Sequence, residues 1–138
     1  MRLLLALALV MTLLLPGAAQ EDAAPWQTTV TRQIEAFRAG DSGTALALAG
    51  AVFRSQFDGQ PEAFYAAILA TGYQPVVQSR SHSFGDFSKL TDSFVVQVVL
   101  LVGPDQGLYE ALYQLADEPD EGWRVVGVVL HRQAGIGI

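Results

Sequence analysis

The sequence predicts an α+β fold, in which N-terminal helices pack on a curved four-stranded antiparallel sheet to give a cone-like domain. Two observations predict it. Apolar residues recur at helical spacing between residues 26 and 72, and apolar strand-like runs separated by turn sequences fill residues 76–132. Because the two kinds of element do not alternate along the chain, a sheet covered by helices on one face is favoured over a parallel α/β sheet.

The first 19 residues resemble a secretory signal peptide. Arg2 supplies the positive start, Leu3 to Leu15 form the apolar run, and residues 17–19 are small, as signal peptidase requires. A retained membrane anchor is the alternative, but a span needs about 20 apolar residues. We expect cleavage after Ala19 and a periplasmic or secreted bacterial protein. Residues 20–25 would then be a flexible lead-in, residues 26–132 a single domain and residues 133–138 a tail.

Charge and cysteine content narrow the class of partner. The full chain has a formal net charge of −6, a single lysine (Lys89) and no cysteine. An acidic chain without a basic stripe is a poor binder of nucleic acid and of anionic lipid. A domain of this size folds without disulfides, and their absence fits a bacterial periplasm better than a disulfide-rich extracellular module. We therefore expect no nucleic-acid partner, and no membrane partner once the signal is removed.

Three helices are predicted in the first half of the domain. The first starts at Trp26, carries apolar residues at helical spacing and ends at Gly40. Asp41 is a natural N-cap for a short alanine-rich helix that ends at Ala49, and residues 51–57 are expected to be irregular. The third helix starts at Pro61, since proline suits a first turn, and ends before residue 72.

Four strands are predicted after the helices, over residues 76–87, 94–102, 108–116 and 123–131. The glycine- and proline-containing segments 103–107 and 118–122 are typical hairpin turns. Strict alternation places Val126, Val128 and Leu130 on one face of the last strand, away from Trp123 and Val125. This second apolar face predicts a homodimer through the sheet. The alternative is a strongly curved sheet that covers the face with its own rim.

Three features make the chain resemble the nuclear-transport-factor-2-like superfamily. They are the segment 37–41 (Phe-Arg-Ala-Gly-Asp) between a long and a short helix, the hairpin-rich sheet, and the segment 122–125 (Gly-Trp-Arg-Val) that opens the last strand. The resemblance implies the cone-shaped α+β fold shared with ketosteroid isomerase and scytalone dehydratase. Segments 72–75, 80–85 and 111–115 make the chain resemble, more closely, a family of secreted alphaproteobacterial proteins known as a domain of unknown function. That family implies no activity.

His82 and Arg80 are the polar candidates for chemistry. Imidazole titrates near neutrality, and alternation would place His82 on one strand face with Asp86. Four residues along a strand span about 13 Å, which is too far for a hydrogen bond unless a bulge at Gly85 shortens it. Arg80 would meet an anion inside the cone or, as the favoured interpretation, pair with an acid such as Glu110. Alternation of Ser79, Ser81 and Ser83 predicts a solvent-exposed face.

Metal binding is not predicted. The chain has two histidines, His82 and His131, without the spacing of a zinc site. The acidic residues of segment 117–121 do not have EF-hand spacing, so a solvated turn is favoured over weak calcium binding. We expect no metal and no cofactor, and we assign no catalytic residue.

Aromatic residues are the candidates for a pocket between sheet and helices. Pockets are mostly apolar with few polar groups, and tyrosine provides both kinds of surface. Tyr109 and Tyr113 share one strand face with Ala111 between them. Aromatic residues at such spacings also fill cores, and that interpretation is favoured for most of them. The predicted ligand-binding set is Arg80, His82, Tyr109, Tyr113, Trp123 and Tyr65.

The leading hypothesis for function is a non-enzymatic domain that binds a small apolar molecule or a protein partner. The alternative is a cofactor-free isomerase, dehydratase or cyclase that uses His82, Arg80 and the pocket tyrosines. Catalysis of the ketosteroid isomerase type requires a carboxylate base inside the cone, and this base would have to be Glu110 or Asp86. A third hypothesis is a structural adaptor whose apolar sheet face docks another subunit.

Overall fold

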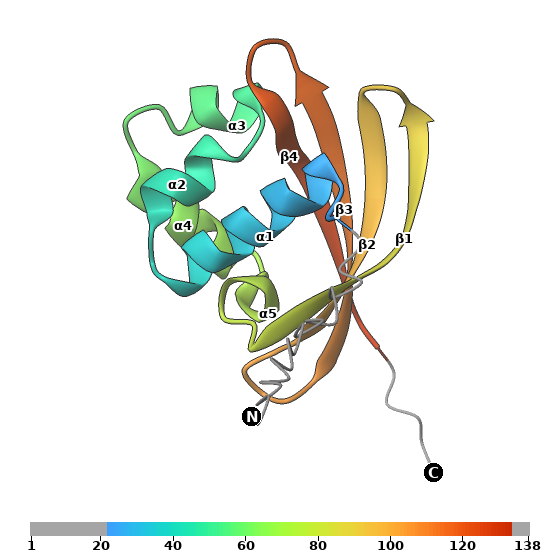
Figure 1. Ribbon diagram of the computed structural model, residues 1–138. Helices are drawn as coiled ribbons and strands as arrows, with labels where there is room; N and C mark the ends of the chain where they lie inside the picture. The colour runs from blue at the N-terminus through green and yellow to red at the C-terminus, as the bar shows by residue number, and fades with distance from the viewer. Residues whose placement is uncertain (1–21, 134–138) are drawn as a thin grey trace, which may run out of the picture.

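The computed structural model describes residues 22–133, and in this part of the chain five helices precede four strands (Figure 1). The helices pack against one face of an open antiparallel sheet, so the predicted α+β fold is confirmed. The predicted signal peptide and nearly all of the predicted tail lie outside the described residues. None of the helices between residues 22 and 133 has the length and apolar character needed to cross a bilayer.

Helix α1 (Pro25–Arg38) forms because its apolar residues fall on one face. Trp26, Val30, Ile34 and Phe37 are all buried against the sheet or the other helices, as their spacing predicts. The helix starts one residue earlier than expected, at Pro25, since a proline at the first helical position loses no hydrogen bond. The predicted lead-in is therefore shorter than residues 20–25.

Helices α2 (Ser42–Ala47) and α4 (Pro61–Ala70) lie where they were predicted, although α2 ends two residues early. The side chain of Asp41 caps α2 by accepting from the amide of Thr44 at 3.1 Å. The prediction of an irregular segment at residues 51–57 is wrong, because Ala51–Gln56 form helix α3. Its first amide donates to both carboxylate oxygens of Glu118 at 3.1 Å, a partner 67 residues away.

The predicted start of the first strand is also wrong. Gln74–Val77 form a single helical turn, α5, and the strand β1 spans Ser81–Thr91. Pro75 suits the first turn of a helix, and the turn buries Val76 and Val77 together in the core. Ser79 follows this turn and is buried, so only Ser81 and Ser83 of the three serines are exposed as predicted.

The sheet is a meander in the order β1-β2-β3-β4, with β2 at Phe94–Val102, β3 at Leu108–Glu118 and β4 at Gly122–Arg132. The register shifts at three places, of which one lies between Lys89 and Thr91 beside the β1–β2 turn and the other two are bulges within strands. In β1 the bulge falls between Phe84 and Phe87, so the residues Gly85 and Asp86 have no partner on β2. In β4 it falls at Val126, since Gly127 pairs with Gln114 and Val125 with Leu115.

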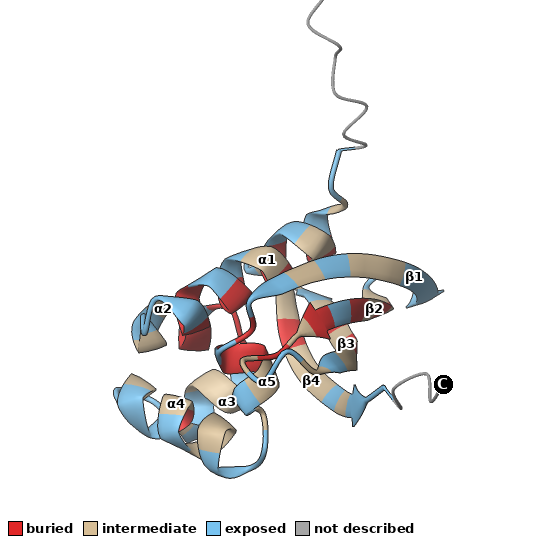
Figure 2. Ribbon diagram, turned by 90° about the horizontal axis from the view of Figure 1, so that it is seen from below, coloured by how far each residue is buried: buried red, intermediate tan, exposed pale blue. Residues whose placement is uncertain are grey.

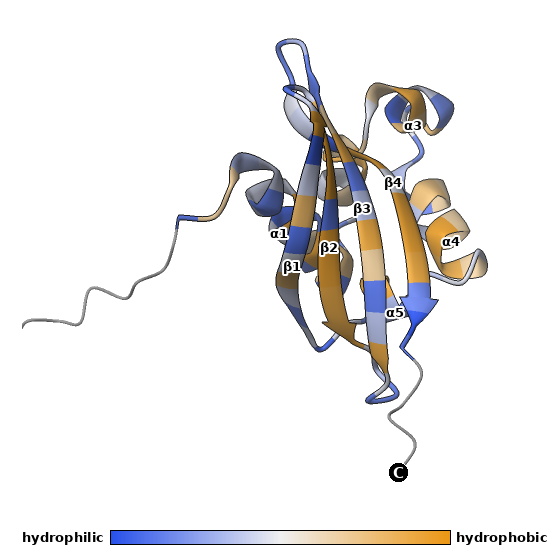
Figure 3. Cartoon of the chain, turned by 90° about the vertical axis from the view of Figure 1, so that its right-hand side faces the viewer, coloured by the Kyte–Doolittle hydropathy of each residue, from blue (hydrophilic) through white to orange (hydrophobic). Residues whose placement is uncertain are grey.

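The β4 bulge overturns the predicted composition of the outer face. Beyond it, Val128 pairs with Tyr113 and Leu130 with Ala111, and both apolar side chains pack against the core on the helix side. A one-residue insertion exchanges the two faces of a strand, which strict alternation does not anticipate. The outer face is instead formed by alternate residues of β2 with Leu112 and Val129. Figure 3 shows the sheet from the side opposite the helices.

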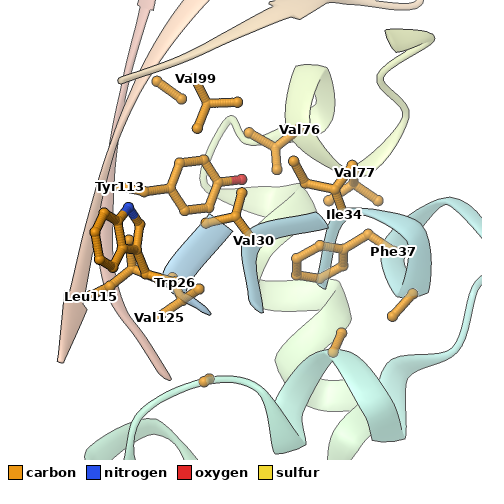
Figure 4. Packing of buried hydrophobic residues seen from close by; sticks show 14 of the residues in the cluster. Trp26, Val30, Ile34, Phe37, Val76, Val77, Val99, Tyr113, Leu115 and Val125 are labelled. Atoms are coloured by element: carbon orange, nitrogen blue, oxygen red, sulfur yellow. The ribbon is translucent and has the colours of Figure 1, made fainter. Parts of the chain in front are cut away.

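The core lies between the helices and the inner face of the sheet (Figure 2). Figure 4 shows side chains of α1, α5 and the sheet meeting there. Gln97 is fully buried in this apolar core. Its amide nitrogen donates to the carbonyl oxygens of Gly85 (2.9 Å) and Asp86 (3.3 Å), and its oxygen accepts from the indole of Trp26 at 2.9 Å. Gln97 therefore satisfies the backbone that the β1 bulge leaves unpaired.

Candidate functional site

A cavity of about 450 Å³ lies between the helices and strands β3 and β4. This volume falls within the range of roughly 300–1,000 Å³ that small-molecule sites occupy. Its walls are mainly aromatic and aliphatic, and they come from helices α1, α3, α4 and α5, from loop residues between the helices and from the sheet. The lining residues are Gln33, Phe37, Ala49, Phe53, Gln56, Phe57, Phe64, Ala67, Ile68, Thr71, Tyr73, Val76, Tyr113, Val125, Gly127 and Val128.

Three local features shape the cavity: a bulge, a cluster of aromatic rings and an exposed mouth. The β4 bulge at Val126 turns Val128 inward, opposite Tyr113 on β3. The rings around Phe64 form a second wall, with ring centroids 6.1 Å from Phe37 and 5.5 Å from Phe57. Gln56 and Thr71 are the exposed members of the lining, and they mark where the cavity meets solvent.

Helix α3, which contributes part of the lining, packs Phe53 against the core and is also held by charged groups. None of its residues is buried, and Val52 is 78% exposed. The guanidinium of Arg54 lies 3.1 Å from the Glu118 carboxylate and 3.0 Å from that of Glu121, both at the β3–β4 hairpin. Both acids belong to the acidic segment 117–121, for which the sequence favours a solvated turn over weak calcium binding. In the structure they pair with Arg54.

Most polar groups of the lining already have partners within the protein. The amide nitrogen of Gln33 donates to the Ala45 carbonyl at 3.0 Å, and the hydroxyl of Thr71 donates to the Ala67 carbonyl at 2.8 Å. The hydroxyl of Tyr73 donates to the Val128 carbonyl at 2.8 Å and so ties α5 to β4. Each of these groups already donates a hydrogen bond within the protein.

Tyr113 is the exception. Its side chain is fully buried, and its hydroxyl points from the sheet toward the helices near Val76 and Val30 (Figure 4). Within residues 22–133, this hydroxyl has no hydrogen-bond partner. Buried polar groups are nearly always paired, and leaving one unpaired costs about 1–3 kcal/mol. Burial also raises the pKa of the Tyr113 phenol, so the group stays protonated and able to donate.

Of the six residues predicted to bind a ligand, Tyr113 lines the cavity and the other five do not. Tyr65 packs beside Phe37 and donates to its carbonyl oxygen at 3.3 Å. Trp123 packs edge-on against Trp26, with ring centroids 5.5 Å apart. Tyr109 shares the inner face with Tyr113, as predicted, but its hydroxyl donates to Asp105 at 3.0 Å.

His82 lies on the neighbouring part of the sheet, where it lines a separate depression of about 280 Å³ together with Tyr109. Its Nδ1 accepts from the Arg38 guanidinium at 3.3 Å, so in the neutral ring Nε2 carries the proton and donates to Thr31 at 3.1 Å. Partial burial, and then the Arg38 charge, lower the pKa of the His82 imidazole. A bulge does form beside Gly85, but no hydrogen bond joins His82 to Asp86 in the described residues.

Arg80 forms neither of the contacts that were predicted for it. It is exposed, lies outside the cavity and has no ion pair with Glu110 in the part of the chain that the structure describes. Its guanidinium instead lies 2.9 Å and 3.2 Å from the side-chain oxygen of Gln106, in the amide orientation that satisfies both groups. Arg80 lies between the α5 turn and the start of β1, whereas the prediction had placed it inside a strand over residues 76–87.

The predicted ligand-binding set did not include Tyr73, which lines the cavity. It also missed the polar lining residues Gln33, Gln56 and Thr71. No motif distinguishes these residues, because their shared position arises from packing between segments far apart in the chain. No group of three or more potential metal-ligating side chains occurs within residues 22–133.

The comparisons with known proteins place the chain in a family. A family model described as "Domain of unknown function (DUF4864)" matches residues 19–138. The chain belongs to this family. No curated protein and no solved structure matches it. Membership of a domain-of-unknown-function family is thus confirmed, while the wider resemblance to the nuclear-transport-factor-2-like superfamily stays a prediction.

Proposed function

We propose that this protein is a periplasmic or secreted binding protein that takes a small, mainly apolar molecule into the cavity between its helices and sheet. The observation that carries the proposal is the cavity itself, with about 450 Å³ of space and sixteen lining residues of which none is charged. A pocket of this size and character buries most of a small apolar ligand. The cone-shaped fold that the superfamily resemblance implies agrees with a pocket at this place.

The enzymatic alternative receives less support from the same lining. Acid–base catalysis without a cofactor needs a carboxylate or imidazole within reach of the substrate. Asp86 and Glu110 do not line the cavity, and His82 lies in a different depression. We therefore propose binding rather than turnover.

Filling the cavity is expected to abolish ligand binding. Ala67 on α4 lines the cavity, whereas its neighbour Ala66 is exposed and does not. Ala67→Trp places an indole in the space that a ligand would occupy, and Ala66→Trp is the matched control. Binding is measured by the fluorescence of 2-(dimethylamino)naphthalene, an uncharged apolar probe. We expect the wild type and Ala66→Trp to bind it and Ala67→Trp not to bind it.

Circular dichroism melting of each variant checks that the fold is retained. Thr71→Trp, at the exposed mouth of the cavity, is a second blocking variant should Ala67→Trp fold poorly. Equal binding by the wild type and both blocking variants, or no binding by the wild type, would contradict the proposal.

We further propose that two copies associate through the outer face of the sheet. Leu100 of β2 and Val129 of β4 are 39% and 42% exposed on this face, beside the half-buried Leu112. Exposed apolar side chains on a sheet face are a feature of interaction sites.

Sedimentation velocity tests this association. The wild type is expected to sediment as a dimer and Leu100→Glu as a monomer. Val52→Glu, which changes an exposed residue of α3 away from the sheet, should stay dimeric. A monomeric wild type would disprove the interface.

A further inference from the structure

The unpartnered Tyr113 hydroxyl indicates the chemical class of the ligand, given the binding function proposed above. We infer that the cavity receives a neutral, mainly apolar molecule that carries one oxygen acceptor, such as a ketone or ester carbonyl, and that Tyr113 donates a hydrogen bond to it. Tyr113 is fully buried and is one of the residues that line the cavity. Within the described residues its hydroxyl has no partner of its own.

The remaining polar groups of the wall exclude a more polar ligand. The hydroxyls of Tyr73 and Thr71 and the amide nitrogen of Gln33 all donate to backbone carbonyls. Gln56 is exposed at the mouth. Tyr113 is therefore the one buried donor of the wall that has no partner at all within the described residues, and a molecule with several polar groups would leave most of them unsatisfied.

The absence of charge among the sixteen lining residues decides between a carbonyl compound and a carboxylate. A buried carboxylate needs a cation or several donors, and one phenol does not replace its hydration. A neutral carbonyl needs a single donor, which Tyr113 supplies. Because an unpaired buried hydroxyl is costly, a ligand that satisfies it gains specificity over a plain hydrocarbon of the same size.

Prodan, which is 2-(dimethylamino)naphthalene with a propionyl ketone, tests this inference by fluorescence. Its emission shifts to the red when the ketone accepts a hydrogen bond. We expect the Tyr113→Phe complex to emit to the blue of the wild-type complex, with prodan bound about 3- to 10-fold more weakly. 2-(Dimethylamino)naphthalene, which lacks the ketone, should bind both proteins equally.

Two further arms sharpen the test. 2-Acetylnaphthalene is expected to compete with prodan, whereas 2-naphthoate, an anion of similar size, is not. Without ligand, Tyr113→Phe should melt at the same or a higher temperature than the wild type, since it loses no internal hydrogen bond. Tyr73→Phe, which loses the bond to Val128, should melt lower.

The outcomes separate this inference from the proposed function. Identical prodan affinity and emission in the wild type and Tyr113→Phe would overturn the role of Tyr113 while leaving apolar binding intact. Competition by 2-naphthoate as strong as that by the ketone would overturn the preference for a neutral ligand. Failure of the wild type to bind either naphthalene probe would instead overturn the binding function.

Discussion

Replacing Trp26 with alanine is expected to lower the free energy of unfolding by about 3–5 kcal/mol. The indole is 6% exposed and packs edge-on against Phe87 and Trp123, with ring centroids 5.0 Å and 5.5 Å away. Alanine would leave a cavity among these rings and would remove the donor to Gln97. Urea denaturation followed by circular dichroism measures the change.

Trp26→Phe is the matched variant, because it keeps a ring but loses the indole N–H. We expect Trp26→Phe to lower the free energy of unfolding by less than Trp26→Ala does. Loss of the hydrogen bond accounts for about 1 kcal/mol of this change. Gln27 still donates to the same Gln97 oxygen at 3.2 Å, which limits this loss. A cost below about 1 kcal/mol for Trp26→Ala would show that the ring cluster does not hold α1 to the sheet.

Replacing Gln97 with leucine is expected to lower the free energy of unfolding by a similar amount, about 3–5 kcal/mol, although leucine is close in size and more apolar. The glutamine is fully buried and makes hydrogen bonds with both its amide nitrogen and its oxygen. Leucine would leave the Gly85 carbonyl and the Trp26 indole unpaired in the interior, at about 1–3 kcal/mol for each group. The bulged part of β1 should also exchange its amide hydrogens faster, which hydrogen exchange measures.

Gln114→Leu is the control, since Gln114 lies on the outer face of β3 opposite Gly127 and is only half-buried. It should change the free energy of unfolding by less than about 0.5 kcal/mol. The double variant Trp26→Phe, Gln97→Leu should cost less than the sum of its parts, because both changes break the same hydrogen bond. Full additivity, or a stable Gln97→Leu protein, would contradict this account of the buried network.

The elements that local sequence predicts well are those whose pattern and end signals agree. Helix α1 has an apolar stripe followed by Gly40, and α2 has its Asp41 cap, so both were placed to within a few residues. Strand β2 is almost continuously apolar and was predicted with its observed bounds, Phe94–Val102. In each case the neighbouring residues contain the information that decides the structure.

The predictions that failed depended on distant partners. Val76 and Val77 have strand propensity, yet they form a helical turn because both fit the core behind α1. Helix α3 starts at Ala51, whose backbone amide donates a hydrogen bond to the carboxylate of Glu118, 67 residues away in the sequence. The extra residue Val126 turned Val128 and Leu130 inward, and a bulge has no dependable local signal.

The candidate site was predicted only in part for the same reason. Alternation along β3 correctly placed Tyr109 and Tyr113 on the inner face. Which of the two tyrosines lines the cavity depends on where the helices lie. The hydroxyl of Tyr109 donates to Asp105, whereas that of Tyr113 is buried among apolar side chains and has no partner within the described residues. Tyr73 lies in the cavity wall, where its hydroxyl donates a hydrogen bond to the carbonyl of Val128, 55 residues away in the sequence.

The sequence by itself determined the order and kind of most elements and the inner face of the central strands, since periodicity and capping act between near neighbours. Only the tertiary structure decided the two bulges, the turn at α5 and the cavity with its unpaired hydroxyl. These features arise where surfaces far apart in the chain meet. Their shapes there depend on side-chain volumes and hydrogen bonds that no local pattern encodes.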